Sequence, residues 1–207
     1  MAARCNLVEE DLLRAAGFSG IAGIDEAGRG PLAGPVVVAA VVLPLDFSHP
    51  RLDDSKKLSP KAREQIFEEI TSDNRISWAV VEVGVEEIDR LNILRATHEG
   101  MRRVVRLLSV PVDHVLIDGL PVEPYPLPQK ALVGGDGLCL SIAAASVCAK
   151  VIRDRKMQLI DAAFPQYGFA KHKGYGTALH MERLREYGPT PHHRRSFAPV
   201  QQMVLPL

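Results

Sequence analysis

Short apolar segments, bounded by glycine, proline and polar residues, recur through the first two thirds of the chain. The longest, Val36 to Leu43, contains only Val, Ala and Leu, a composition typical of a strand that is buried on both faces. Similar but shorter segments predict further strands over residues 20–25, 76–83, 115–118 and 131–133. We expect these strands to form a central sheet.

Helical patterns lie between and after these strands. Ser59 followed by Pro60 has the features of an N-cap and a first helical turn. Side chains from Ile93 to Leu108 recur at helical spacing on one face, which predicts a single helix in that region. The predicted helices cover residues 7–16, 59–71, 86–108, 141–164 and 179–186. The chain beyond them, including Val200 to Leu207, is expected to form loops.

Strands interspersed with helices indicate an α/β protein with a mixed central sheet flanked by helices. Residues from about 141 to 207 are predicted to form a helical, basic C-terminal part that packs on the sheet or beside it. We expect residues 1–207 to form a single domain, because this length suits one domain of ordinary size.

The composition is that of a globular protein and excludes several other classes. Of the 207 residues, 46% are hydrophobic and 24% are charged, which supplies a core without disulfides or a structural metal. Low net charge and many aliphatic residues exclude intrinsic disorder. No apolar run is long enough for a transmembrane helix, and no apolar segment of the kind found in signal peptides follows Met1–Asn6. The cysteines, Cys5, Cys139 and Cys148, lack metal-binding spacing, so we expect reduced thiols in a cytoplasmic protein.

The net charge of zero conceals an uneven distribution along the chain. Residues 1–149 contain 15 basic and 21 acidic side chains, a net charge of −6, whereas residues 150–195 contain 10 basic and 4 acidic ones, a net charge of +6. An acidic body can hold metal ions, and a basic C-terminal quarter can bind a polyanion. Charge alone leaves a second interpretation open, in which these residues form solvated helix faces.

Two adjacent carboxylates, Asp25 and Glu26, end the first apolar segment and are followed by Gly28, Arg29 and Gly30. Neighbouring side chains of a strand point to opposite faces, so both acids serve one site only if the strand breaks there or if one acts through water. The glycines let a ligand approach the backbone closely, and Arg29 adds a cation. An Asp-Glu pair alone is more often surface charge, but this context makes it a candidate site.

Two further aspartates lie where site residues are expected. Asp118 ends the strand predicted over 115–118, and ligands of open α/β sheets bind beyond strand ends. Asp136 precedes the long predicted helix. Each also has a structural interpretation, Asp118 as a turn residue and Asp136 as a turn or N-cap residue. The four carboxylates together offer oxygen ligands suited to Mg²⁺ or Mn²⁺, and a pair of such ions can hydrolyse a phosphodiester.

Five motifs, in this order along nearly the whole chain, resemble those of bacterial ribonuclease HII. They are GIDEAGRGPLAGPV at 23–36, DSKKLS at 54–59, LIDG at 116–119, SIAAASVCAKVIRDRKM at 141–157 and HKGYGT at 172–177. The resemblance implies a ribonuclease H-like fold with a C-terminal helical extension. It also implies an endonuclease that cuts the RNA strand of RNA–DNA hybrids and cuts beside single ribonucleotides in duplex DNA, leaving 3′-hydroxyl and 5′-phosphate ends.

The resemblance also implies roles for the acids. By position, Asp25, Glu26 and Asp118 match the metal-binding acids of the family, and Asp136 matches its fourth active-site carboxylate. The family often has Lys at the position of Gly134, so this chain lacks one cation near the site, and we expect its metal affinity or pH optimum to differ. The expected cofactor is Mn²⁺ or Mg²⁺. Our hypothesis is that water on one metal ion attacks the phosphorus 5′ to the ribonucleotide, while a second ion stabilises the departing 3′-oxygen.

The same resemblance implies contacts with the substrate. Gly28, Arg29 and Gly30 match a loop that reads the 2′-hydroxyl of the ribonucleotide through its backbone, a contact that distinguishes RNA from DNA. Tyr175 matches a tyrosine that stacks on the sugar after the ribonucleotide, although a tyrosine alone is equally well a packed residue. Candidate phosphate contacts are Lys56, Lys57, Lys150, Lys171, Lys173 and Arg194. Taken singly, each of these cations is more often solvated.

Other polar residues receive a structural interpretation. Four histidines near the C-terminus lack a metal-binding pattern and are predicted to be surface or loop residues. They are His172, His180, His192 and His193. Asp154 is expected to pair with a neighbouring arginine on its helix.

The expected partners are RNA–DNA hybrids and duplex DNA that contains ribonucleotides, without membrane contact, and we expect a monomer. Two alternatives stay open: a related two-metal nuclease that favours long hybrids, and a non-catalytic module that binds hybrids. The presence of all four acids favours the enzyme over the binding module.

Overall fold

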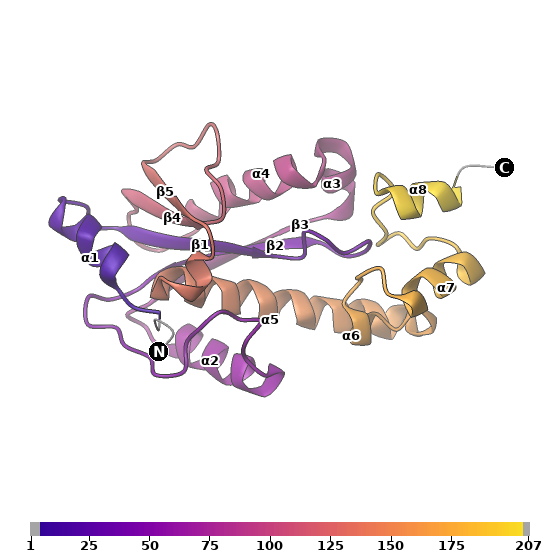
Figure 1. The fold of residues 1–207 in the computed structure, drawn as a ribbon, viewed down its shortest axis with the longest axis horizontal. Coiled ribbons are helices and arrows are strands. Elements are labelled where there is room, and N and C mark those ends of the chain that lie inside the picture. The colour runs from indigo at the N-terminus through magenta and orange to yellow at the C-terminus, as the bar shows by residue number, and fades with distance from the viewer. Residues whose placement is uncertain (1–4, 205–207) are drawn as a thin grey trace.

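The computed structural model describes residues 5–204 and contains a mixed sheet between two layers of helices (Figure 1). The strands are β1 (Ile21–Ala27), β2 (Val36–Val42), β3 (Ser77–Val83), β4 (His114–Asp118) and β5 (Gln129–Leu132). Their order in the sheet is β3-β2-β1-β4-β5. β1 pairs antiparallel with β2 and parallel with β4. The predicted α/β class with a mixed central sheet is therefore confirmed.

Helices cover both faces of this sheet. They are α1 (Val8–Ala15), α2 (Pro60–Ser72), α3 (Val85–Leu91), α4 (Ile93–Val105), α5 (Leu140–Ala163), α6 (Phe169–His172), α7 (Ala178–Tyr187) and α8 (Ala198–Val204). The long α5 packs along β1 and β2 with α2 beside it, and α4 covers the opposite face. The C-terminal helices α6, α7 and α8 lie at the far end of α5 (Figure 1).

The central strand β2 is buried on both faces because helices pack on each side of it. Val37, Ala39 and Val41 point into the core that α2 and α5 complete. Val38 and Ala40 alternate with them and point into the core beneath α4. This arrangement is the one that the continuous apolar run predicts.

The helix α5 lies unusually close to β1 because its first turns carry small side chains. A Cβ atom on Gly23 would come within 2.2 Å of the carbonyl carbon of Ser141, so only glycine fits at this crossing. A residue from the other end of the sequence, Glu10, caps the start of the helix. Its buried carboxylate accepts hydrogen bonds from the Ser141 N–H at 3.0 Å and the Ser141 hydroxyl at 2.7 Å. These contacts fix the start of α5 beside the edge of the sheet where β1 and β4 end.

The prediction of one helix over residues 86–108 was wrong, because the chain breaks at Asn92 into α3 and α4. Asn92 has a φ of 70°, and its side-chain oxygen accepts the Arg95 N–H at 3.0 Å as the N-cap of α4. Asparagine is a favoured N-cap residue, and the positive φ at this position turns the chain between the two helices. The apolar spacing continues across the break and therefore gives no sign of it.

The prediction of a loop at the C-terminus is confirmed for residues 188–197, which form turns and irregular structure, but was wrong for the segment that follows. α8 extends from Ala198 to Val204, and Val200 is fully buried against Leu32 and Leu184. Residues 205–207 belong to the same prediction and lie outside the described residues. Among residues 5–204, no helix combines the length and apolar character that crossing a membrane requires.

Candidate active site

The parallel pairing of β1 and β4 brings two acids to one edge of the sheet. Ile24 lies opposite Ile117 in the ladder, so Asp25, which is still within β1, lies beside Asp118, the last residue of β4. Asp25 is only 5% exposed. Ligands of α/β sheets gather at such strand ends.

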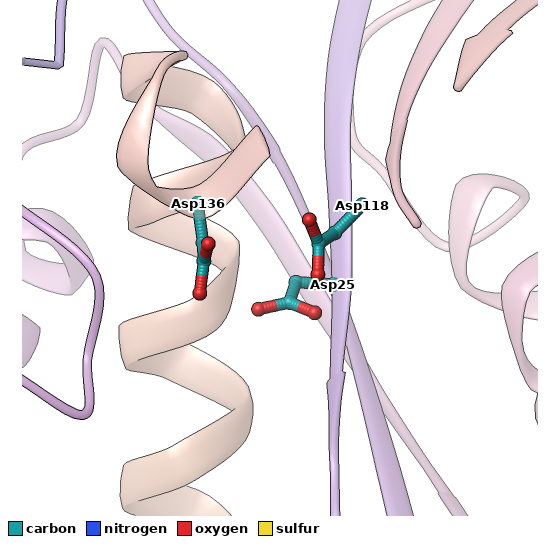
Figure 2. A group of neighbouring side chains, drawn as sticks. All are labelled: Asp25, Asp118 and Asp136. Carbon is teal, nitrogen blue, oxygen red and sulfur yellow. The ribbon is translucent and has the colours of Figure 1, made fainter. Parts of the chain in front are cut away.

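The short helical turn Gly135–Gly137, which precedes α5, contributes the third acid. The Gly135 N–H donates to Asp118 Oδ1 at 2.7 Å, and this hydrogen bond holds the turn against β4. Asp136 therefore faces the other two aspartates (Figure 2). Carboxylate oxygens of Asp25, Asp118 and Asp136 all lie within 4.8 Å of one another. Three converging hard oxygen ligands suit a divalent cation such as Mg²⁺ or Mn²⁺.

Glu26 follows Asp25 in β1 but lies outside this group of three aspartates. Its Oε1 pairs with Arg29 Nη1 at 3.3 Å, while its buried Oε2 has no hydrogen-bond partner within residues 5–204. An unpartnered buried carboxylate oxygen beside three other carboxylates indicates a cation-binding site. The four acids therefore fit a divalent metal, with Glu26 as the one whose side chain would need to turn.

Burial and mutual repulsion favour the protonated form of these acids. Burial raises the pKa of Asp25 well above its usual range, and the charges of Glu26 and Asp118 raise it further. Burial and the charge of Asp118 raise the pKa of Asp136 to about 6. Burial also raises the pKa of Glu26, against the opposing charge of Arg29. A bound cation would reverse this balance by favouring the ionised carboxylates.

A cavity of about 290 Å³ opens directly beside Asp25 and Glu26. It combines acids, cations, a glycine-rich loop and an aromatic side chain, as a site for a nucleic acid requires. Its lining includes Gly28, Arg29, Gly30, Ser55, Lys56, Ser146, Lys150, Arg153 and Tyr175. The Tyr175 side chain is accessible, with the residue 48% exposed. Ser55, Ser146 and Arg153 were not predicted as site residues from the sequence; the signal for Ser146 is a polar residue within the buried alanine run of α5.

The lysines proposed as phosphate contacts differ in their positions. Lys56 reaches toward Asp136, with 3.7 Å between Nζ and Oδ2. Lys57 is exposed, pairs with Asp53 and does not line the cavity. Lys150 lines the cavity and donates to Asp154 at 2.7 Å. Asp154 also pairs with Arg63 of α2, so its partners are a lysine on its own helix and an arginine on another, not the neighbouring arginine expected. Lys171 and Lys173 line a separate hollow near α6.

Arg194 was wrongly predicted as a phosphate contact, because its guanidinium is fully buried. It donates to the carbonyl groups of Gly28, Arg29 and Gly34 instead. Arg153, another cation of the basic C-terminal quarter, is only 1% exposed. The positive charge of this quarter is therefore partly internal.

The prediction that the C-terminal histidines are surface or loop residues was wrong for His172 and His180, which are buried in α6 and α7; His193 lies in a loop, as predicted, but is buried as well. His172, His180 and His193 are buried and lie in one cluster with Tyr167 and Phe169. Hydrogen bonds to backbone groups satisfy their ring nitrogens. These partners are distant in sequence or are backbone groups that any residue type can supply, so the sequence pattern does not identify them.

Comparison with known proteins identifies the family to which this site belongs. The model of the family described as "Ribonuclease HII" matches residues 22–200. The chain belongs to the ribonuclease HII family. Ribonuclease HII of Geobacillus kaustophilus is 55% identical over 192 residues, which are 93% of this chain and 73% of that protein. Ribonuclease HII of Syntrophotalea carbinolica is 52% identical over 93% of this chain and 92% of its own length.

A solved structure gives the same result for the fold. The crystal structure of ribonuclease H2 from Pyrococcus horikoshii OT3 has a TM-score of 0.74 and 25% identity, and the match covers 88% of this chain and 96% of that one. The ribonuclease H-like fold implied by the sequence motifs is thus confirmed. As a ribonuclease HII, the protein is an endonuclease of the ribonuclease H class that acts on the RNA strand of RNA–DNA hybrids with the help of a divalent metal.

Proposed function

We propose that this ribonuclease HII nicks duplex DNA on the 5′ side of single embedded ribonucleotides, in addition to cleaving the RNA strand of longer hybrids. The products carry 3′-hydroxyl and 5′-phosphate ends. The observation that carries the proposal is the cavity that Asp25, Glu26, the Gly28–Gly30 loop and an accessible Tyr175 border together, with Asp118 and Asp136 converging on Asp25 beside it.

Each group in the cavity has a task in this reaction. Asp25, Glu26, Asp118 and Asp136 hold the divalent metal, Mg²⁺ or Mn²⁺. When bound, such ions acidify water and stabilise the oxygen that leaves phosphorus, whether one or two ions act. The chain itself contributes the anionic ligands and a buried environment in which their charges act strongly.

The substrate is held by groups on the other sides of the cavity. Backbone groups of Gly28, Arg29 and Gly30 contact the ribose and read its 2′-hydroxyl. Tyr175 stacks on the following sugar, which in a nicking substrate is a deoxyribose. Lys56, exposed beside Asp136, neutralises a phosphate near the metal, and Lys57, which lies outside the cavity, provides a weaker contact with the substrate beyond it.

The test is cleavage of a DNA duplex that contains one ribonucleotide, with the cut mapped at nucleotide resolution in Mg²⁺, Mn²⁺ or EDTA. We expect one nick 5′ to the ribonucleotide that is lost in EDTA and in Asp25→Asn. Cleavage confined to long hybrids would keep the metal-dependent nuclease and remove the role of Tyr175. Binding without cleavage of either substrate would contradict the proposal.

A further inference from the structure

Two arginines are buried beside the candidate active site without an acidic partner. Arg153 is 1% exposed and Arg194 is 0% exposed, and neither forms a salt bridge in the part of the chain that the structure describes. Burial and the nearby charge of Arg153 lower the pKa of Arg194 to about 9. Burying unpaired cations is costly. Proteins tolerate such local costs mainly where function requires them.

The hydrogen bonds of Arg194 all end on the loop that begins at Gly28. Its Nη2 donates to the Gly28 carbonyl at 2.6 Å, and its Nη1 donates to the Arg29 carbonyl at 2.8 Å. Its Nε donates to the Gly34 carbonyl at 3.0 Å. Because a guanidinium presents its donors in a fixed plane, these contacts set the orientation of successive peptide groups.

This orientation determines where the amide N–H groups of the loop point. The N–H of a trans peptide points opposite to its carbonyl, and the peptide bonds of this loop are trans. With the Gly28 and Arg29 carbonyls turned toward Arg194, the N–H groups of Arg29 and Gly30 point away from it. Neither N–H donates to an acceptor within residues 5–204, and both residues line the cavity. Arg194 thus leaves two successive donors available to a ligand, an arrangement that binds oxygen anions and hydroxyls.

His193, the residue before Arg194, is connected by hydrogen bonds to Tyr175, which we propose contacts the sugar after the ribonucleotide. The Thr190 N–H donates to His193 Nδ1 at 2.9 Å, and the Nε2 atoms of His193 and His180 are 3.0 Å apart. His180 Nδ1 lies 2.9 Å from the Tyr175 carbonyl oxygen. A carbonyl only accepts, so the His180 proton is on Nδ1, and His180 Nε2 accepts a hydrogen bond from the N–H at His193 Nε2. This chain of neutral rings permits one direction of hydrogen bonding and ends on the backbone of Tyr175.

The Gly28–Gly30 loop and Tyr175, the two parts of the site that we propose recognise the substrate, lie next to each other. A Cβ atom on Gly30 would have the Tyr175 ring as its nearest neighbour, at 3.6 Å. We propose that the segment Thr190–Arg194 is a positioning clamp that sets both elements together. Arg194 orients the N–H donors of the Gly28–Gly30 loop. His193, through its hydrogen bond to His180, fixes the position of Tyr175 relative to those donors. This inference rests on the proposed function, because it assigns the clamp to the recognition of a ribonucleotide next to DNA.

The loop arm of the clamp is tested with Arg194→Lys, which keeps the charge but replaces the fork by one ammonium group. We expect kcat/KM on a duplex with one ribonucleotide to fall by about tenfold or more, mainly through KM, because misdirected donors weaken substrate binding. Mn²⁺ affinity, measured by calorimetry on the same variant, stays at the wild-type value, since the aspartates do not contact Arg194.

The tyrosine arm is tested with His180→Leu and His180→Asn. Asparagine places an N–H donor near the position of Nδ1, whereas leucine has none. The readout is the ratio of cleavage rates on a single-ribonucleotide duplex and on a long RNA–DNA hybrid. We expect His180→Leu to lower this ratio by about fivefold, the order of one lost hydrogen bond, and His180→Asn to restore most of it.

A matched control is Tyr167→Phe, which keeps the ring beside His193 and removes only a partly buried hydrogen bond from the Tyr167 hydroxyl to the Gly188 carbonyl. It touches neither the Gly28–Gly30 loop nor Tyr175, so it lowers Tm without changing the rate ratio. The clamp is refuted if Arg194→Lys and His180→Leu behave as this control does. Should Arg194→Lys fail to fold, the two His180 variants still decide. A wild-type protein that cuts only long hybrids would refute the proposed nicking activity, while the effect of Arg194→Lys on hybrid cleavage would still test the clamp.

Discussion

The acid cluster and the buried arginine pair both gather like charges away from water, but they satisfy those charges differently. Arg153 and Arg194 direct their donors to carbonyl groups of the chain itself. Among the acids, Glu26 has a buried oxygen without a partner in the described part of the chain, and burial raises the pKa values of Asp25 and Asp136. The arginines are therefore satisfied within the folded chain, whereas the raised pKa values of the acids agree with our proposal that they hold an exchangeable cation. One region fixes the shape of the site, and the other supplies its chemistry.

The largest effect is expected from removing the charge of one acid. Asp118→Asn is predicted to lower the cleavage rate by about 10³-fold or more, as for groups that act together in catalysis. The same variant should be as stable as the wild type or more stable in EDTA, because it relieves repulsion among buried carboxylates. Cleavage assays and thermal unfolding in EDTA measure the two outcomes. Activity above a tenth of the wild-type rate would remove Asp118 from the metal site.

A second large effect is expected at the contact between the loop and the arginines. Gly28 has a φ of 98°, and a Cβ atom there would lie 1.9 Å from Arg153 Nε. Gly28→Ala should lower the free energy of unfolding by about 2–4 kcal/mol, from backbone strain and overpacking together, and should also abolish most activity.

The control for this substitution is Gly17→Ala, at a φ of 100° with no atom near the added Cβ. It isolates the backbone strain, which is about 1 kcal/mol, and leaves cleavage unchanged. Equal losses of stability in the two variants, measured by denaturant unfolding, would show that Arg153 does not pack against the loop as described.

A smaller effect is expected from pH on the metal-free protein. Asp136 has its pKa raised from 3.8 to about 6, so the folded state binds more protons than the unfolded state between these values. Stability in EDTA should therefore fall as pH rises from about 4 to 7, with part of this slope absent in Asp136→Asn. Unfolding curves across this range measure the slope, and a slope that Asp136→Asn leaves unchanged would contradict the assignment. The Asp136→Asn comparison is needed because Asp25 and Glu26 also contribute to the slope.

The smallest effect is expected at Gly134, where the motif resemblance predicts a lysine in many related proteins. Gly134 has a φ of 70° and open space around it, so Gly134→Lys costs only about 1–2 kcal/mol of backbone strain. The added cation near Asp136 should lower the pKa of that acid and move the acidic limb of the pH–rate profile to lower pH. Gly17→Lys imposes similar strain at a residue that neither lines the cavity nor belongs to the acid cluster, and it should leave the profile in place. An unchanged profile in Gly134→Lys would show that this position does not influence the acids.

Much of the acidic site was predictable from sequence because strand ends in an α/β sheet meet at one edge. Asp25 and Asp118 each follow an apolar run, and the parallel pairing of their strands brings them together. Asp136 was harder to predict, since only the hydrogen bond from Gly135 to Asp118 turns it toward the others. The motif resemblance supplied what periodicity alone did not.

The buried polar residues were not predictable from the pattern. In the sequence, Arg194 looks like one more cation in a basic stretch. Its partners are carbonyl groups of the loop at Gly28, which any residue type can supply. The same holds for His180 and His193, whose hydrogen bonds join a loop to a helix. A one-dimensional pattern records which side chains are apolar, but it does not record which polar ones find partners inside.

The contrast between the two charged regions is tested most directly by thermal unfolding at pH 7.5 in EDTA and in increasing Mn²⁺. The wild type and Arg194→Lys should both gain stability with Mn²⁺, by about 2.7 kcal/mol at a hundredfold excess over Kd, although Arg194→Lys starts from a lower Tm. Asp25→Asn should start at or above the wild-type Tm in EDTA and gain little from the metal. A gain in Asp25→Asn equal to that of the wild type would contradict the account, because the cation would then bind elsewhere.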